Sequence, residues 1–241
     1  MTGTTKRSRG HVLRICVLLL STLGFAAGAH AACRDAVVLV HGNAGSPSDY
    51  ANTWSELRAR GYAADEIFRP SWGSKTCAAC NDHSGSETGP VDAALIDAAA
   101  RSCTGRIDVI GHSMGATLAA KRIQVLGMRS YVDAFVGIAG AFRGLWSCGT
   151  YPFNVTTTTC GAQGLSVSSP LVESLAGRRF GDYMVSIKSY NDQIVCFGGV
   201  CTVGGRHSSS MDAEDRTVTL AGYGHFGLLT LTAGLQADLI E

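Results

Sequence analysis

The sequence IDVIGHSMG at residues 107–115 decides the fold of this chain. An apolar strand, predicted over 106–110, runs straight into Gly111-x-Ser113-x-Gly115 and then into a helix that ends near Leu126. This pattern is typical of the sharp strand-to-helix turn that exposes a nucleophilic serine. A glycine-flanked serine is a common chance match in a chain with 30 glycines. The buried strand before it and the helix after it make the match specific.

The two glycines of the motif have a steric purpose. A side chain at Gly111 or Gly115 is expected to clash with the neighbouring strand or helix, whereas Ser113 projects its hydroxyl at the carboxyl edge of the sheet. The helix points its N-terminus at the site, where free N–H groups favour developing negative charge. The alternative is a glycine-flanked serine in an ordinary turn.

Strands and helices alternate along the rest of the chain. Strands are predicted at 36–40, 64–68, 106–110, 132–139, 183–190 and 216–220. Helices are predicted at 46–60, from Pro90 onward, at 114–126 and at 170–176, with a last helix that carries Leu228, Leu231, Leu235 and Leu239 on one stripe. This alternation favours an α/β domain with a mainly parallel sheet, helices on both faces and right-handed crossovers.

A nucleophilic serine needs a base. In α/β domains whose serine lies on such a strand-to-helix turn, the order along the chain is serine, acid, histidine. Two histidines follow Ser113. His225 comes just after the last predicted strand and before the last helix, where this fold places its base. His207 is predicted to lie in an exposed loop and stays the alternative. The side chain of His112 is expected to point away from Ser113.

The acid comes from the carboxylates between the serine and the base. The candidates are Asp133, Glu173, Asp182, Asp192, Asp212, Glu214 and Asp215. Asp192 alone directly follows a predicted strand, so it is expected at the carboxyl edge with Ser113 and His225. It would accept the Nδ1 proton of His225 and fix the tautomer. A turn-capping role for Asp192 is the alternative.

The first strand ends in His41-Gly42-Asn43, beside the strand that carries Ser113. A backbone N–H of this turn, together with that of Met114, is placed to bind the oxyanion. A plain strand-to-helix turn is the alternative.

Composition excludes several classes of protein. Hydrophobic residues make up 46% of the chain and charged residues 16%, so the chain can bury a sizeable core. Lys plus Arg is 20 and Asp plus Glu is 19, so no strong positive field argues for nucleic acid. No ligand cluster suggests a cofactor or a metal, and the sequence leaves the oligomeric state open.

The first 31 residues have the features of a signal peptide. Basic residues from Lys6 to Arg14 precede an apolar run, Ile15–Ala27, and Ala29-His30-Ala31 supplies a cleavage site. The run is short of the roughly 20 residues that cross a bilayer. We therefore expect a secreted protein, extracellular or periplasmic, whose mature domain spans 32–241 without a stable membrane span.

Eight cysteines remain after residue 31, and an even count in an exported chain predicts disulfides. Three predicted pairs close short loops: Cys77–Cys80, Cys148–Cys160 and Cys196–Cys201. Cys33 and Cys103 precede the first buried strand and the strand of Ser113. Those strands are parallel neighbours in this fold, which predicts a Cys33–Cys103 pair. A redox role for Cys77-Ala78-Ala79-Cys80 is the alternative, but its surroundings are typical of a loop.

Regular signals fade from Ala141 to Asp182. A long loop in a compact domain is usually functional, so residues 142–182 are predicted to form a cap or substrate-binding loop over the carboxyl edge. Its apolar contacts would come from Leu145, Trp146, Tyr151 and Phe153. A surface loop pinned by Cys148–Cys160 is the alternative.

Four segments together resemble the bacterial lipase class 2 family of α/β-hydrolases: VLVHGN at 38–43, GHSMG at 111–115, NDQIV at 191–195 and GHF at 224–226. The segment AFRGLWSC at 141–148 also resembles part of a secreted polyhydroxybutyrate depolymerase. The resemblance implies a triad of Ser113, Asp192 and His225, with Asn43 and Met114 as oxyanion donors.

Three functions follow as hypotheses. The first is a lipase or esterase that transfers an acyl group to Ser113 and then to water. The second is an extracellular polyester depolymerase. The third is a hydrolase-like binding protein without catalytic activity.

Overall fold

The structure is a computed structural model that describes residues 1–4, 33–153 and 155–241. The predicted signal peptide lies outside these residues from position 5 onward, so it stays a prediction. None of the helices in the described part of the chain is long and apolar enough to cross a membrane.

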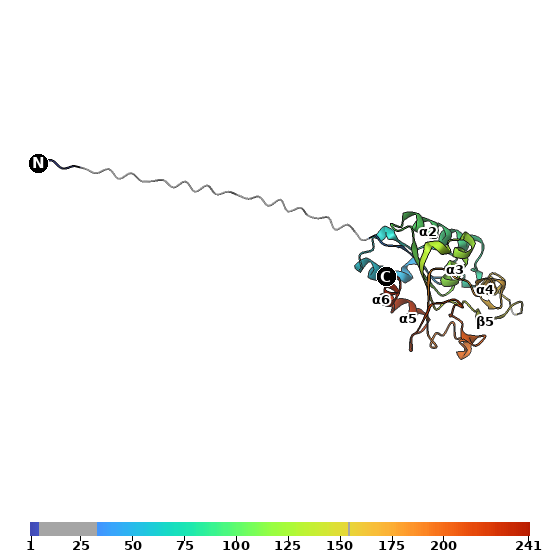
Figure 1. The fold of residues 1–241 in the computed structure, drawn as a ribbon. Helices are drawn as coiled ribbons and strands as arrows, with labels where there is room; N and C mark the ends of the chain where they lie inside the picture. The colour runs from blue at the N-terminus through green and yellow to red at the C-terminus, as the bar shows by residue number, and fades with distance from the viewer. Residues whose placement is uncertain (5–32, 154) are drawn as a thin grey trace. The chain divides into compact units, whose positions relative to one another are not determined.

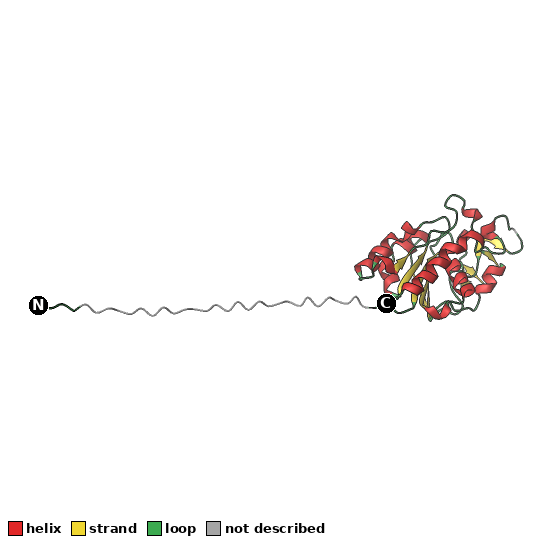
Figure 2. Cartoon of the chain, turned by 90° about the horizontal axis from the view of Figure 1, so that it is seen from above, coloured by secondary structure: helices red, strands yellow, loops and turns green. Residues whose placement is uncertain are grey.

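Six parallel strands form the central sheet, in the order β10-β7-β4-β3-β1-β2. The strands are β1 (Ala36–Val40), β2 (Ile67–Phe68), β3 (Ile107–His112), β4 (Val132–Ile138), β7 (Tyr183–Lys188) and β10 (Arg216–Thr219). Figure 2 shows them in yellow between the helices. The prediction of a mainly parallel sheet is confirmed.

Helices cover both faces of this sheet, because its strands are apolar on both sides. Along β1, Val38 and Val40 pack into one core, and Val37 and Leu39 pack into the other. The first core is covered by α2 (Thr88–Arg101) and α3 (Met114–Leu126), and the second by α1 (Ala51–Ala59), α5 (His225–Thr230) and α6 (Ala233–Asp238). In Figure 1, α2 and α3 lie on one side of the sheet and α5 and α6 on the other.

Parallel strands bring their following loops to one edge of the sheet. The loops after β1, β3, β7 and β10 therefore meet at the carboxyl edge, although they are far apart in the sequence. In open α/β sheets this edge is where ligands bind.

The last helix differs from its prediction, because α5 and α6 are separate helices. They are separated at Leu231 and Thr232, whose backbone leaves the helical region with φ −103° and −116°, and the Thr232 hydroxyl donates to the carbonyl of Leu228 at this break. Leu231 lies at the break and is 71% exposed, whereas Leu228 and Leu239 are buried. The predicted single apolar stripe is therefore wrong at Leu231.

Short elements also differ from their predicted bounds. The 3-10 helices Pro47–Tyr50 and Ala64–Glu66 replace the start of one predicted helix and most of one predicted strand. Within 142–182 the structure has β5 (Leu145–Thr150), β6 (Ser166–Val167) and the predicted helix, α4 (Pro170–Leu175). A two-stranded hairpin, β8 (Thr202–Val203) and β9 (Arg206–His207), follows β7.

Four cysteine pairs join the loops, and they are the pairs that the sequence predicts. Three of them close short loops, between cysteines 3, 12 and 5 positions apart in the sequence: Cys77–Cys80, Cys148–Cys160 and Cys196–Cys201. The fourth, Cys33–Cys103, joins residues 70 apart, just before β1 and β3. Because β1 and β3 are paired in parallel, this disulfide lies at the amino edge, opposite the loops described above.

Candidate active site

Ser113 lies between β3 and α3 in an unusual backbone conformation, with φ 54° and ψ −131°. Its N–H donates to the carbonyl of Ile138 at the end of β4, at 2.8 Å. A positive φ at a residue other than glycine is strained and persists only where the surroundings hold it. This turn is the sharp strand-to-helix connection that the sequence predicts.

The flanking glycines are required by main-chain contacts. A Cβ at Gly111 would lie 2.4 Å from Cα of Ala116 in α3. A Cβ at Gly115 would lie 2.0 Å from the carbonyl oxygen of His41, just after β1. The predicted steric reason for both glycines agrees with these distances.

The structure brings His225 and Asp192 together. Nδ1 of His225 lies 2.8 Å from Oδ2 and 3.0 Å from Oδ1 of Asp192. The two residues follow β10 and β7, and only 3% of His225 and none of Asp192 is exposed. The side-chain amide oxygen of Gln193 accepts the N–H of His225 at 3.1 Å, which fixes the start of α5.

The Asp192 carboxylate is held by the chain that follows it. Its Oδ1 accepts the N–H groups of Ile194 and Val195, each at 2.9 Å. Burial raises the pKa of Asp192, but the hydrogen bonds from His225 and these two N–H groups outweigh burial and lower the pKa below its ordinary value. Asp192 therefore stays ionised beside the imidazole of His225.

One pocket of about 160 Å³ lies over the serine. Ser113 and His225 both line it, so the nucleophile and the base predicted from the sequence share a cavity. Its other lining residues are Gly42, Asn43, Gly45, Asp49, His112, Ile194 and Phe226. All of them lie at the carboxyl end of β3 or in the segments that follow β1, β7 and β10.

One of the two predicted oxyanion donors lines this pocket, and the other directly follows Ser113 in the sequence. Asn43 lines it, and Met114 is the first residue of α3, directly after Ser113. Within the described residues, neither backbone N–H donates a hydrogen bond to the protein. Met114 belongs to the first turn of a helix, where an N–H has no partner inside the helix.

The ring of His112 packs against the candidate base, a contact that the sequence analysis did not predict. Its Nε2 lies 3.2 Å from the carbonyl oxygen of His225, and the two ring centroids are 4.7 Å apart. Burial and the nearby His225 lower the pKa of His112 to about 3. A neutral imidazole therefore packs against the candidate base. The sequence feature that could have indicated this contact is the position of His112 next to Ser113, at the end of a buried strand.

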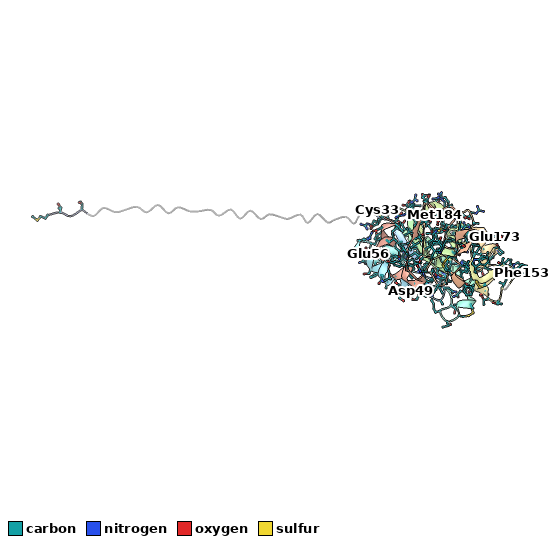
Figure 3. All side chains as sticks on the ribbon, turned by 90° about the horizontal axis from the view of Figure 1, so that it is seen from below. Cys33, Asp49, Glu56, Phe153, Glu173 and Met184 are labelled. Atoms are coloured by element: carbon teal, nitrogen blue, oxygen red, sulfur yellow. A yellow bond between two sulfur atoms is a disulfide. The ribbon has the colours of Figure 1, made fainter. Side chains whose placement is uncertain are left out.

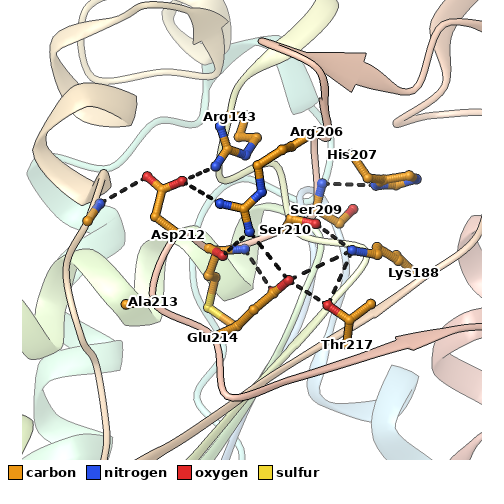
Figure 4. A network of polar contacts seen from close by, with 12 residues as sticks. Arg143, Lys188, Arg206, His207, Ser209, Ser210, Asp212, Ala213, Glu214 and Thr217 are labelled. Carbon is orange, nitrogen blue, oxygen red and sulfur yellow. Dashed lines mark hydrogen bonds and ion pairs between the residues drawn. The ribbon is translucent and has the colours of Figure 1, made fainter.

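His207 is buried and does not lie in an exposed loop, so that prediction is wrong. Its Nε2 donates to the carbonyl of Ser189 at 3.2 Å, and its Nδ1 accepts the N–H of Ser209 at 3.1 Å. Figure 4 shows the bond to Ser209. Because both ring nitrogens are occupied, and because the pocket over Ser113 is lined by His225, His207 is not placed as the base.

The other candidate acids do not line the pocket, and all of them except Glu173 form ion pairs with described residues. Asp133 and Asp182 contact Arg106 at 2.7 and 2.6 Å, near the amino edge. Asp212 pairs with Arg143 and Arg206, and Glu214 lies 3.8 Å from the buried Lys188, in the network that Figure 4 shows. Asp215 pairs with Arg179. Glu173 is exposed on α4.

Of the described residues 142–153 and 155–182, none lines the pocket over Ser113. Leu145 is buried in the core, and the indole N–H of Trp146 donates to the carbonyl of Thr202 at 2.8 Å. Phe153 is 69% exposed and lies at the edge of the folded domain in Figure 3. A role of this segment as a cap or substrate-binding loop stays a prediction.

Two groups of side chains have the spacing of metal ligands within the described residues. Cys196, Cys201 and His207 form one, but both of its sulfurs belong to a disulfide. Asp35, Asp108 and Asp133 form the other, at the amino edge. Oδ1 of Asp108 accepts the N–H of Ala134, and burial raises the pKa of Asp108 well above its ordinary value. Neither group contacts the pocket over Ser113.

Comparison with known proteins gives a family match for the sequence. A family model described as lipase (class 2) matches residues 34–238. No curated protein matches the sequence. The resemblance of residues 141–148 to a polyhydroxybutyrate depolymerase stays a prediction.

Solved structures show the same fold. Lipase B of Aspergillus fumigatus aligns with a TM-score of 0.59 and 19% identity, over 85% of this chain and 52% of that one. The mature lipase BlEst2 of Bacillus licheniformis aligns with a TM-score of 0.63 and 13% identity, over 87% and 93%. An esterase of Pyrobaculum calidifontis aligns with a TM-score of 0.52 and 18% identity, over 85% and 77%. The chain thus spans about half of the Aspergillus lipase.

Proposed function

This chain belongs to the lipase (class 2) family, and on that premise we propose that it hydrolyses carboxylic esters through an acyl-enzyme on Ser113. The observation that carries the proposal is the buried pair of His225 and Asp192 beside the pocket that Ser113 lines. A serine on a strained turn, a histidine and an ionised carboxylate are the three parts of such a mechanism.

Each residue has a defined step. Nε2 of His225 takes the hydroxyl proton of Ser113 while Oγ attacks the ester carbonyl carbon. The N–H groups of Asn43 and Met114 stabilise the resulting oxyanion. The intermediate collapses, and His225 gives its proton to the departing alcohol. Water then attacks the acyl-enzyme in the same way, which releases the acid and restores Ser113. Asp192 stabilises the imidazolium of His225 in both halves.

The exposed residues at the rim of the pocket, Ile194 and Phe226, favour an apolar ester as substrate. Ile194 and Phe226 line the pocket and are 42% and 63% exposed. Tyr190, Phe197 and Val200 are also exposed, in the loop after β7. The segment 193–205 contains no charged residue, and neither does 220–237. A rim of this kind fits a neutral water-insoluble ester, such as a triacylglycerol.

The same open rim fits a polymer chain, so an extracellular polyester depolymerase is the second candidate. We also propose that the protein is secreted, to the extracellular medium or the periplasm, which four disulfides support.

Parallel assays separate these functions. We expect turnover of a short p-nitrophenyl ester and of a triolein emulsion, with slower release of acid from amorphous polyhydroxybutyrate. Faster release from the polyester would reverse the order of the two candidates. No turnover of any of the three would leave the chain a binding protein without catalysis.

The rim predicts a difference between dissolved and emulsified substrates. We expect Ile194→Ser to lower activity on triolein about 5- to 10-fold, because roughly 1 kcal/mol of apolar contact is lost, and to change p-nitrophenyl acetate turnover less than twofold. The matched control is Ile96→Ser, at an exposed isoleucine on α2. Equal losses on both substrates, or equal losses in both variants, would show that the rim does not contact the emulsion.

A further inference from the structure

The side chain of Asn43 is held at both of its polar atoms. Its Nδ2 donates to the carbonyl of Ala78 at 3.0 Å, and its Oδ1 accepts Nδ2 of Asn81 at 2.7 Å. The side chain therefore faces the loop 74–81, which leaves the backbone N–H of Asn43 for the pocket.

The turn that carries Asn43 depends on such anchoring. Ala44, the next residue, has φ 53°, a conformation that costs a residue other than glycine about 1–3 kcal/mol unless its surroundings impose it. A Cβ at Gly42, on the other side, would lie 3.1 Å from Cβ of Ser113. A strained residue and a tight contact thus flank the predicted donor.

Asn81 is itself fixed in orientation. It is 1% exposed. Its Oδ1 accepts the N–H of Ser74 at 2.7 Å, and its Nδ2 donates to the carbonyl of Ser74 at 2.9 Å as well as to Asn43. Both polar atoms of the amide are used, so the amide group is oriented with its donor toward Asn43.

The second anchor, the carbonyl of Ala78, lies inside the short loop that Cys77–Cys80 closes. The hydroxyl of Thr159 contacts this carbonyl at 2.6 Å and that of Asn81 at 2.5 Å. Thr159 precedes Cys160, whose disulfide ties it to β5. The segment 142–182 thus braces the loop that holds Asn43.

We propose that Asn81 is a positioning residue that sets the place of the Asn43 N–H in the oxyanion hole. The Cys77–Cys80 loop supplies a second hydrogen bond to the Asn43 side chain, through the carbonyl of Ala78, and we call these two contacts the clamp. The inference rests on the proposed function. An oxyanion donor acts only when it lies 2.7–3.1 Å from the developing charge. A displacement of about 1 Å can cost up to about 100-fold in rate.

The test is Asn81→Ala in the full, oxidised chain. We expect kcat on p-nitrophenyl butyrate to fall about 10- to 100-fold, with KM within about twofold, because the donor acts on the transition state. Ki for an alkyl trifluoromethyl ketone, which forms an oxyanion on the serine, rises by a similar factor. A kcat within threefold of wild type in a folded protein overturns the proposal, as does a fall in kcat with unchanged Ki.

A control and a second variant keep the test decisive. Thr53→Val removes another buried hydrogen bond, 2.7 Å from Thr53 to Gln236, and is expected to lower the melting temperature without a change in kcat. Cys77→Ser/Cys80→Ser loosens the clamp without touching Asn81. It is expected to lower kcat by a smaller factor, and it decides the matter if Asn81→Ala does not fold. An unchanged kcat in that variant then overturns the proposal.

Failure of the inference is distinct from failure of the proposed function. If Asn81→Ala keeps wild-type kcat while Ser113→Ala is inactive, only the clamp is wrong. If Ser113→Ala stays active, the proposed function is wrong, and the clamp with it.

Discussion

Ser113→Ala is expected to lower kcat on a p-nitrophenyl ester by about 10⁴- to 10⁶-fold, because the acyl-enzyme cannot form without the hydroxyl. The change removes one oxygen and leaves the strained turn, with its φ of 54°, to a residue of similar size. The melting curve is therefore expected to stay close to that of wild type. Initial rates with purified protein, together with the melting curve, give the measurement.

A second serine provides the matched control. Ser186 is fully buried in β7, and within the described residues its hydroxyl has no hydrogen-bond partner. Ser186→Ala is expected to keep wild-type kcat. A diethyl phosphoryl reagent should add its mass to the peptide with Ser113 and to no peptide of Ser113→Ala. Activity of Ser113→Ala within tenfold of wild type, in a folded protein, contradicts the assignment of the nucleophile.

Asp192→Asn is expected to lower kcat by about 10²- to 10⁴-fold with little change in KM. The carboxylate oxygen that accepts the N–H groups of Ile194 and Val195 has to remain an oxygen in the amide. The NH₂ group then takes the place of Oδ2, 2.8 Å from Nδ1 of His225. It donates to Nδ1, so the ring carries its proton on Nε2 and no longer accepts one from Ser113.

The controls are the carboxylates that the sequence also offered as the acid. Asp182→Asn and Asp212→Asn remove surface ion pairs to Arg106 and to Arg206. They are expected to keep kcat within about twofold, because neither carboxylate lines the pocket over Ser113 and the loss of an exposed pair costs only about 0–1 kcal/mol of folding stability. A near-normal kcat in Asp192→Asn beside a loss in either control would mean that the acid is misassigned. Steady-state kinetics on one soluble ester decide between these results.

Much of the sheet could be predicted from the sequence because its signals are local. Runs of mostly β-branched apolar residues, such as 36–40 and 107–110 (where Asp108 is the exception), mark strands buried on both faces. The spacing of Gly111, Ser113 and Gly115 marks the turn. Asp192 could be chosen among seven carboxylates because parallel strands all end at one edge, so a residue directly after a strand lies near the site.

The remainder depends on contacts between distant segments, which no local pattern encodes. His207 is buried because the carbonyl of Ser189 and the N–H of Ser209 take its ring nitrogens. Asn81 meets Asn43 from 38 residues away. Each outcome depends on a hydrogen-bond partner that only the folded chain supplies.

The glycines at 111 and 115 also bear on the engineering of substrate preference. What a side chain would meet there is main chain: Ala116 in α3 at one position, and His41 after β1 at the other. A second mutation changes side chains and cannot remove backbone atoms. No compensating substitution would therefore create space for a side chain at Gly111 or Gly115. A combinatorial library should leave both positions fixed and place its diversity where side chains alone border the opening, at Ile194 and Phe226.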